Sequence, residues 1–323
     1  MPEDILVSVI IPVYNEEKYI KSCLESMAEQ TFPHQQIEWI IVDGMSKDRT
    51  LSIVKSFTSL DNIRILENKK RIVTYALNLG IQHALGRYIL RMDAHAKYDK
   101  DYIEKCVYYM EHVEADNVGG IVETQGLGYA GNANSEILSS KFGVGNASFR
   151  IGSDSGYVDT VPYGCFRREI FNEIGLFDVE LPRSEDNDFN ARIRENGGKV
   201  YLANDIHSVY YCRDSVIGLL NQGIKNGNAL FLTLRKNPKA MSLRHFIPFC
   251  FVLSLITLPL LGLLSDIFFY ILGVEIVSYL LSDLMFSFSG KIQFLPYKFV
   301  MYPAFHVAYG IGSVLGLFKV RLY

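Results

Sequence analysis

One segment without a single charged side chain, residues 246–264, most limits what this chain can fold into. Such a run is long enough to cross the hydrocarbon core of a bilayer, which takes about 20 apolar residues. Residues 1–242, in contrast, mix charged and apolar side chains as soluble α/β domains do. We therefore expect an N-terminal globular part followed by a C-terminal membrane part.

Two further apolar segments follow this run, at residues 267–282 and 294–318. Glu275 interrupts the first of them, and Lys298 and His306 interrupt the second. Because ionisable side chains are costly inside a bilayer, we expect these three to face protein or lipid headgroups. Two spans with an interfacial helix, or three spans, both fit this pattern.

Basic residues flank the apolar C-terminal part at both ends. Positive charge near a span favours the cytoplasmic side and anionic headgroups, so we expect cytoplasmic flanks and an even number of spans. The N-terminus has no basic region followed by an apolar run, so no signal peptide is expected. These features predict a multi-pass cell-membrane protein whose N-terminal domain is cytoplasmic. The basic residues are Arg235, Lys236, Lys239, Arg244, Lys319 and Arg321.

Charge and cysteine usage argue against two other classes of protein. The net charge is −3 and no basic stripe with interleaved aromatic residues is present, which disfavours a nucleic-acid binder. The five cysteines are scattered without the spacing of a metal or redox site. This favours a reducing compartment without disulfides.

Short apolar, β-prone segments alternate with helical patterns in the globular part. Strands alternating with helices predict a Rossmann-like α/β fold with a mostly parallel sheet and right-handed crossovers. Asn15 is a plausible N-cap of the first helix. The predicted strands are residues 7–11, 37–42, 62–66, 88–92, 117–122, 158–165, 199–203 and 209–212, and later helices are expected at 71–85, 99–112 and 215–235.

Polar side chains follow three of these strands, at Tyr14-Asn15, Asp43 and Asp93. In a parallel sheet these strand ends share the edge where open α/β sheets bind ligands. Each residue is also compatible with a plain helix cap, but three together favour a nucleotide site. Asp93 and His95 are two positions apart and therefore point the same way. A carboxylate and an imidazole so placed suit a divalent cation that binds a diphosphate.

Three segments give the chain a resemblance to a known family: residues 7–16, 40–50 and 76–95. In combination they resemble the family 2 glycosyltransferases of the glycosyltransferase-A fold, over about residues 6–211. The pattern is most similar to the succinoglycan-type exopolysaccharide and capsule transferases. The resemblance implies that the first loop and the Asp after the second strand bind the nucleoside of a nucleoside-diphosphate sugar, most simply a UDP-sugar.

Carried over residue by residue, the resemblance assigns a donor site and a metal site. Asp93 and His95 would hold a divalent metal, Mn or Mg. The second position of this metal motif is His here rather than Asp, and a neutral imidazole suits Mn²⁺ better than Mg²⁺. Arg71 is either a further donor contact or a solvated helix residue. The implied donor-binding residues are Pro12, Tyr14, Glu16, Asp43, Arg71 and Asp93.

An acidic segment follows at Ser184, Glu185, Asp186 and Asp188. Ser184 is a plausible N-cap with acidic residues in the first helical turn, but three carboxylates exceed what a cap needs. The segment resembles the family's Glu-Asp motif, in which one carboxylate deprotonates the acceptor hydroxyl. Asp186 matches that position, with Glu185 or Asp188 as alternatives. A base opposite a metal-held leaving group implies single displacement with inversion.

Acceptor residues are expected in three places. Residues 124–160 are rich in Gly, Asn and Ser, and are expected to form a long loop that either lines the acceptor site or is flexible. Gly164 is either a close approach of backbone to sugar or a turn glycine. Gln222 and Lys225 resemble the Gln-x-x-Arg-Trp element of processive members, although a solvated amphipathic helix also explains them. Lys225 and Asn226 replace the Arg and Trp of that element, so its guanidinium fork and stacking ring are absent.

Together these features predict a glycosyltransferase-A catalytic domain at residues 1–214, an interface helix and linker at 215–244, and a membrane region of two or three helices at 245–323. The expected function is metal-dependent, inverting transfer of a sugar from a nucleoside diphosphate to a polyprenyl-diphosphate-linked glycan. Such a step belongs to exopolysaccharide, capsule or O-antigen synthesis.

Three other functions are alternatives to this one. The first is transfer to the polyprenyl phosphate itself. The second is a non-catalytic nucleotide-sugar-binding component of a polysaccharide export complex. The presence of Asp93, His95 and Asp186 together argues against it, because a binder needs no base. The third, a dinucleotide-dependent dehydrogenase, is disfavoured because no Gly-x-Gly-x-x-Gly follows the first strand.

Overall fold

The computed structural model describes residues 5–60 and 62–322, and the chain forms two compact units. The first unit comprises the residues up to Glu123 together with Gly152–Tyr210. The second comprises Thr124–Ile151 together with the residues from Tyr211 onward. Residues 124–151, which the sequence pattern placed in the catalytic domain, therefore group with the C-terminal helices. They do so because helices within this segment pack on the last helix of the chain.

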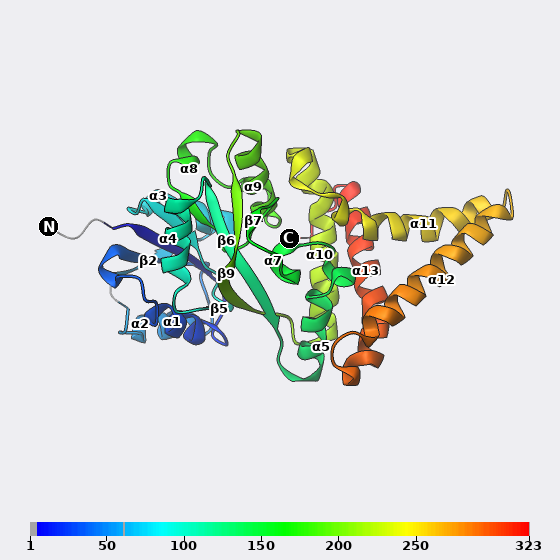
Figure 1. Ribbon diagram of the computed structural model, residues 1–323, viewed down its shortest axis with the longest axis horizontal. Helices are drawn as coiled ribbons and strands as arrows, with labels where there is room; N and C mark the ends of the chain where they lie inside the picture. Colours follow the sequence, from blue (N-terminus) through cyan, green and yellow to red (C-terminus); the bar gives the residue numbers. More distant parts are fainter. Residues whose placement is uncertain (1–4, 61, 323) are drawn as a thin grey trace. The chain divides into compact units, whose positions relative to one another are not determined.

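The core of the first unit is a mixed β-sheet (Figure 1). Within the described residues the strand order is β3-β2-β1-β4-β8-β6-β9-β5, with β7 paired to β9. The strands from β3 to β4 run parallel, and β4 pairs antiparallel with β8. The strands are β1 Val7–Val13, β2 Ile37–Asp43, β3 Ile63–Glu67, β4 Tyr88–Arg91, β5 Ala96–Tyr98, β6 Asn117–Gln125, β7 Gly156–Tyr157, β8 Cys165–Arg167 and β9 Val200–Tyr211.

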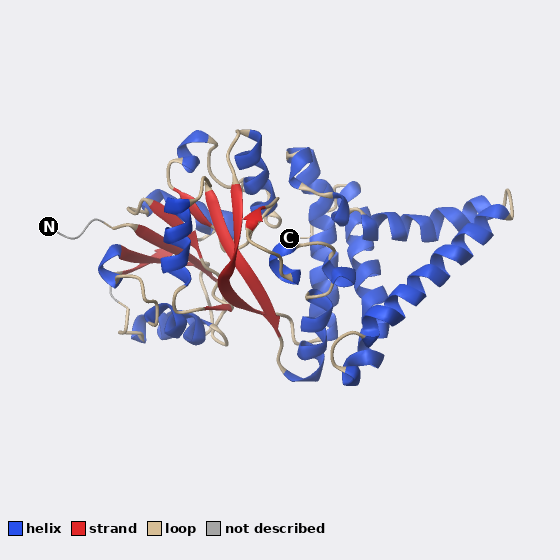
Figure 2. Ribbon diagram, in the orientation of Figure 1, coloured by secondary structure: helices blue, strands red, loops and turns tan. Residues whose placement is uncertain are grey.

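Helices surround this sheet (Figure 2). Strand β2 is buried along its whole length, as expected for an apolar strand that is covered on both faces. Helix α3 approaches β1 so closely that a Cβ at Gly80 would lie 2.5 Å from Ile10 Cγ2, which leaves room only for glycine. The helices of this unit are α1 Ile20–Ala28, η1 His34–Gln36, α2 Thr50–Ser56, α3 Val73–His83, α4 Tyr102–His112, α8 Ile170–Glu173 and α9 Glu185–Glu195.

Helix α9 is fixed to the sheet by its buried face. The ring of Phe189 is fully buried, and its centroid lies 4.5 Å from that of Phe177. The amide of Asn190 donates to the Thr160 hydroxyl at 2.8 Å, and its oxygen accepts from the Asn117 amide at 2.6 Å. Burying a phenylalanine contributes about 1.5–3 kcal/mol. These contacts fix the position of the acidic first turn of α9.

The second unit is helical, and α10 packs tightly on α13. A Cβ at Gly227 would collide with the Tyr309 carbonyl, and a Cβ at Gly312 would collide with the Ile224 carbonyl. Small residues after His306 thus allow the close helix packing expected of them. The helices are α5 Gly128–Leu138, α6 Lys141–Val144, α7 Ser148–Ile151, α10 Val216–Lys236, η2 Pro238–Ala240, η3 Leu243–His245, α11 Ile247–Gly262, α12 Ile267–Phe288, η4 Ile292–Phe294 and α13 Leu295–Leu317.

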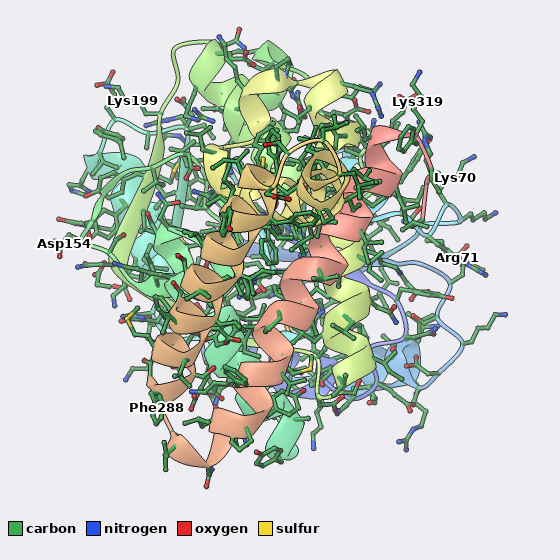
Figure 3. All side chains as sticks on the ribbon, turned by 90° about the vertical axis from the view of Figure 1, so that its right-hand side faces the viewer. Lys70, Arg71, Asp154, Lys199, Phe288 and Lys319 are labelled. Atoms are coloured by element: carbon green, nitrogen blue, oxygen red, sulfur yellow. The ribbon has the colours of Figure 1, made fainter. Side chains whose placement is uncertain are left out.

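In the described part of the chain, three helices are long and apolar enough to cross a membrane: Leu243–Gly262, Ile267–Phe288 and Ile292–Leu317. Only 11% and 6% of the first two are buried within the protein, against 50% of the third. Figure 1 shows α11 and α12 running to a shared turn, and Figure 3 labels Phe288 at the other end of α12. Most of the apolar surface of this helix pair is therefore left uncovered by protein within the described chain.

The ionisable residues in these helices face protein, as expected. Lys298 is 1% exposed, and its ammonium lies 2.7 Å from a carboxylate oxygen of Glu136. His306 Nε2 lies 2.9 Å from the Phe142 carbonyl oxygen. Glu275 accepts a 2.6 Å hydrogen bond from a serine hydroxyl of α11. Each polar group thus has a partner that reduces its desolvation cost.

Several predicted elements differ from those observed. The long loop expected at residues 124–160 instead contains α5, α6 and α7. Its glycines do not interrupt these helices. A Cβ at Gly143 would meet the Ile137 carbonyl, so glycine there allows close approach of the backbone, whereas Gly145 ends α6 with φ 66°. The two strands expected at 199–203 and 209–212 form one strand, β9.

Two further predictions are wrong in detail. The strand expected at residues 158–165 is limited to its end, where β8 begins at Cys165. Asn15 does not cap α1, which begins at Ile20. Asn15 instead takes a left-handed conformation with φ 54°, and its side-chain oxygen accepts from the Lys47 amide at 2.9 Å. Its short polar side chain favours this turn conformation over a cap.

Candidate active site

A buried arginine at the end of β4 is the centre of the site. Arg91 is 7% exposed, and its guanidinium contacts three carboxylates. Nε donates to Asp93 Oδ1 at 3.1 Å, and Nη1 donates to Glu185 Oε1 at 2.9 Å and to Asp186 Oδ1 at 2.6 Å. One cation thus joins the Asp-x-His segment after β4 to the acidic start of α9. Charge-assisted hydrogen bonds of this kind are stronger than neutral ones.

The three acidic candidates on α9 differ in their exposure and partners. The Asp186 side chain is 25% exposed, whereas those of Glu185 and Asp188 are 10% and 5% exposed. Asp188 pairs with Arg192 at 3.0 Å on the same helix. Ser184 precedes α9 as expected, but its side chain makes no capping hydrogen bond and its φ is 62°. Asp186 therefore has the best access to a substrate.

The environment of Asp186 raises the affinity of its carboxylate for a proton. Burial raises the pKa of Asp186, Arg91 opposes the rise, and the charges of Glu185 and Asp93 add to it, so that the pKa reaches about 7. A carboxylate with a pKa near neutrality is suited to act as a general base. The role of Asp186 as the base stays a prediction.

Asp93 and His95 lie in the turn between β4 and β5. Asp93 Oδ1 is held by Arg91, and Oδ2 makes no hydrogen bond to any residue in 5–60 or 62–322. His95 Nδ1 lies 3.1 Å from Glu16 Oε1. Within those residues, no group of three or more His, Cys, Asp or Glu side chains could enclose a metal. This donor set fits a cation that takes few protein ligands and completes its shell with substrate phosphates and water.

The first loop and the metal segment meet through Glu16. The family resemblance assigned Glu16 to the donor nucleoside, and the structure places its carboxylate on the His95 imidazole. A second hydrogen bond joins the Glu16 amide to the Thr50 hydroxyl at 2.7 Å. The loops that follow β1, β2 and β4 therefore converge at one edge of the sheet, as the parallel pattern predicted.

Asp43 is buried at the end of β2. Both of its carboxylate oxygens accept from the Ser46 amide, at 3.2 and 3.1 Å, and Oδ1 also accepts from the Ser46 hydroxyl at 2.6 Å. The Ser46 hydroxyl in turn accepts from the Asn15 amide at 3.0 Å. Asp43 thus shapes the turn after β2 and fixes it to the loop after β1. A direct contact with a nucleoside stays a prediction.

The remaining donor candidates lie around this edge. Pro12 is in β1 beside Val42 of β2. Tyr14 is 43% exposed, and the Arg71 guanidinium lies 5.8 Å from the centre of its ring. Arg71 precedes α3 with φ 58° and lies at the protein surface (Figure 3). An exposed ring beside a cation can stack on a base, since guanidinium and aromatic faces attract each other.

The three acceptor candidates do not all belong to the same unit. Gly164 lies in the first unit, where a Cβ would collide with the Asn117 side chain. This packing gives a structural reason for glycine at that position. Gln222 and Lys225 lie on α10 in the second unit, where Lys225 is exposed. An acceptor role for all three stays a prediction.

Two residues of the site were missed by sequence reasoning. Arg91 was included in an apolar strand, although a charged residue inside such a strand is itself a signal, because a buried charge needs a partner. Ser46 was treated as part of a polar turn. Its role depends on the Asp43 carboxylate three residues earlier, which accepts hydrogen bonds from both the backbone amide and the hydroxyl of Ser46.

Comparison with protein families matches more than half of the chain to a known family. The profile described as Glycosyl transferase family 2 matches residues 8–175. Among curated relatives, the dolichyl N-acetyl-alpha-D-glucosaminyl phosphate 3-beta-D-2,3-diacetamido-2,3-dideoxy-beta-D-glucuronosyltransferase of Methanococcus voltae is 32% identical over 84% of this chain and 85% of its own length. Succinoglycan biosynthesis protein ExoA of Rhizobium meliloti is 27% identical over 74% of this chain and 73% of its own length.

Solved structures share the fold at low sequence identity. Mannosyltransferase PcManGT from Pyrobaculum calidifontis, in complex with GDP-Man and Mn²⁺, superposes with a TM-score of 0.67 at 18% identity and covers 98% of this chain and 88% of its own. The crystal structure of S. aureus TarS 1-349 in complex with UDP-GlcNAc gives a TM-score of 0.54 at 16% identity, covering 98% of this chain and 93% of its own.

Proposed function

This chain belongs to glycosyl transferase family 2, and we propose that it transfers a sugar from a nucleoside diphosphate to a polyprenyl-diphosphate-linked glycan at a membrane. Its glycosyltransferase-A fold and family are those predicted from the sequence. One observation supports the reaction most directly. A single guanidinium, that of Arg91, brings the metal-motif carboxylate of Asp93 together with Glu185 and Asp186.

In the proposed step, Asp186 takes the proton of an acceptor hydroxyl. The hydroxyl oxygen then forms a bond to the anomeric carbon of the donor sugar, and the bond between that carbon and the phosphate oxygen breaks. The electron pair leaves with the nucleoside diphosphate. Attack from the face opposite the leaving group inverts the anomeric configuration, and no carboxylate need act as nucleophile.

Asp93 and His95 are the residues that would hold a divalent cation. When bound, this cation would supply positive charge to the leaving diphosphate. The open Asp93 Oδ2 and the imidazole support Mn²⁺ ahead of Mg²⁺, because imidazole is a softer ligand than the oxygen ligands that Mg²⁺ prefers. The Pyrobaculum mannosyltransferase, which shares the fold, was likewise solved with Mn²⁺.

The donor is proposed to be a UDP-sugar that occupies the edge formed by Pro12, Tyr14, Glu16 and Asp43, with Arg71 beside it. The exposed Tyr14 ring under the Arg71 guanidinium supports a stacked base at this point. Proteins of the same fold have been solved in complex with UDP-GlcNAc and with GDP-Man, so the nucleotide needs a direct test.

The acceptor is proposed to be lipid-linked and to be used on the cytoplasmic side of the membrane. The uncovered apolar surface of α11 and α12 supports insertion of this helix pair. The name of the Methanococcus relative describes transfer to a dolichyl-linked sugar phosphate, and that of the Rhizobium relative describes succinoglycan biosynthesis. A lipid-linked acceptor agrees with the first name, and a step in exopolysaccharide, capsule or O-antigen synthesis agrees with the second.

Calorimetric titration with nucleotides tests the donor site. Detergent-solubilised protein is titrated with UDP and GDP, each with and without Mn²⁺. We expect UDP to bind only with Mn²⁺, and Asp93→Ala to abolish this binding. Lys199→Ala is a matched control, because Lys199 pairs with Glu114 on the surface of the same unit. Metal-independent binding, or binding that survives Asp93→Ala, would contradict the assigned metal site.

Turnover separates the proposed enzyme from two of the alternatives, the polyprenyl-phosphate transferase and the binding component. Protein that binds Mn²⁺ and UDP is incubated with UDP-glucose, UDP-galactose, UDP-N-acetylglucosamine or GDP-mannose. The acceptors are undecaprenyl phosphate and undecaprenyl-diphosphate-linked N-acetylglucosamine. Transfer to the second acceptor is expected. Transfer to undecaprenyl phosphate alone would indicate a polyprenyl-phosphate transferase, and nucleotide binding without transfer would indicate a binding component.

A further inference from the structure

We propose that Arg91 is a positioning residue that fixes the base Asp186 and the cation ligand Asp93 in one arrangement, an inference that rests on the proposed function. The two carboxylates come from distant parts of the chain. Asp93 follows β4, and Asp186 lies in the first turn of α9. Within the residues that the structure describes, the Arg91 guanidinium is the side chain that pairs with both.

The hydrogen bonds of Arg91 leave one oxygen of each carboxylate unbonded in the described part of the chain. The Arg91 guanidinium donates to Oδ1 of Asp93 and to Oδ1 of Asp186. For each carboxylate, Oδ2 makes no hydrogen bond to another described residue. Arg91 therefore orients both groups and leaves one oxygen of each for chemistry. Asp186 Oδ2 is the atom left to accept the acceptor proton, and Asp93 Oδ2 is the atom left to bind the cation.

The rigidity of the two supports makes this orientation effective. Arg91 pairs with Ile10 of β1 in the parallel part of the sheet, and its amide donates to the Gly164 carbonyl at 3.0 Å. The start of α9 is held by the burial of Phe189 and by the Asn190 hydrogen bonds. Because β4 and α9 are both held in place, the Arg91 guanidinium between them fixes the positions of the Asp93 and Asp186 carboxylates. Proton transfer tolerates only small errors in such positions.

Other arginines of the first unit show what a purely structural role looks like. Arg167 on β8 donates to the Ala115 and Met110 carbonyls, at 2.9 and 3.0 Å. Arg192 pairs with one carboxylate and donates to two carbonyls. The side chain of Arg91, in contrast, contacts three carboxylates and no carbonyl among the described residues. Two of these three are the proposed base and metal ligand.

Arg91 also partly neutralises the three carboxylates around it. Asp93, Glu185 and Asp186 surround one guanidinium, so the four groups sum to a negative charge at neutral pH when all are ionised. Without Arg91 three neighbouring carboxylates would repel one another, which favours separation of their side chains or uptake of protons. Lysine would restore the charge but not the planar, multi-contact geometry. Arg91→Lys should therefore be less active than the wild type and more active than Arg91→Met.

A double-mutant cycle tests whether Arg91 acts through Asp186. We measure kcat and the donor KM for Arg91→Met, Asp186→Asn and the double variant, with the donor and lipid acceptor that give transfer in the turnover assay. Arg91→Met is expected to lower kcat by about 10- to 100-fold, in the range of positioned acid–base catalysis. In the Asp186→Asn background the same change should lower kcat by less than about threefold, because groups acting as a unit are non-additive.

Two controls keep the outcome decisive. Arg167→Met removes a part-buried arginine with only carbonyl partners, so it should lower the unfolding temperature while kcat changes by less than about threefold. If Arg91→Met does not fold, the same cycle is run with Arg91→Lys. If the loss of kcat in the double variant equals the product of the losses in the two single variants, the two residues act independently and the inference is overturned. Wild-type turnover in Asp186→Asn alone would instead overturn the base assigned in the proposed function.

Discussion

The protonation state of Asp186 decides when this site has a base. Burial raises the pKa of Asp186 to about 7, so the carboxylate becomes protonated as the pH falls below neutrality. A protonated carboxyl cannot accept the acceptor proton, and kcat should fall about tenfold per pH unit well below pH 7. The pH dependence of kcat from about pH 5 to 9 at saturating Mn²⁺ and donor measures this limb. The limb should disappear in Asp186→Asn, and a flat wild-type profile would exclude Asp186 as the base.

Single residues were predictable from the sequence where a local motif defines them. Asp93 was predictable as the polar residue after an apolar strand, but the shared direction expected for Asp93 and His95 does not follow from strand geometry, because β4 ends at Arg91 and a turn closed by the Ala96 amide on the Asp93 carbonyl joins the two residues. Asp186 was assigned by resemblance to a motif, while its advantage over Asp188 required the observed ion pair to Arg192. Arg91 could not be assigned because its three partners include two residues more than 90 positions away in sequence.

At the scale of elements, close contact between α10 and α13 holds the second unit together. Replacing Gly312 by Leu would drive a side chain into the Ile224 backbone, and overpacking of this kind costs about 1–3 kcal/mol or more. We expect a clear drop in the unfolding temperature, measured by differential scanning fluorimetry in detergent. Gly273→Leu is the matched control, because a Cβ at Gly273 of α12 meets nothing within 4 Å. Equal unfolding temperatures for the two variants would contradict close α10–α13 packing.

Elements with strong periodicity were predictable, and those that depend on tertiary contacts were not. The parallel strands β1, β2 and β4 appear as mainly apolar runs followed by polar residues, which is the pattern of a buried parallel sheet. Residues 124–151 appeared loop-like because glycine and asparagine are poor helix formers. Helices α5 and α6 of this segment are stabilised by packing on α13, a contact that local composition does not encode.

At the scale of the whole molecule, the proposed reaction combines a charged catalytic cluster with an apolar helix pair. Membrane insertion of α11 and α12 would confine the protein to the surface that holds its lipid-linked acceptor, which raises the effective acceptor concentration. The C-terminal apolar character was predictable from hydropathy. The number of spans was not, since α13 meets the length and hydropathy of a span and is also half buried within the protein.

The rate of sugar transfer in Asp186→Asn, compared with Asp188→Asn and the wild type, tests the central proposal most directly. All three proteins are placed in nanodiscs with the lipid-linked acceptor, and calorimetry first establishes that Mn²⁺-dependent donor binding is intact. We expect Asp186→Asn to lose turnover by roughly 10²-fold or more, as for loss of a general base, while Asp188→Asn loses much less. Equal turnover in wild type and Asp186→Asn would contradict the proposed mechanism.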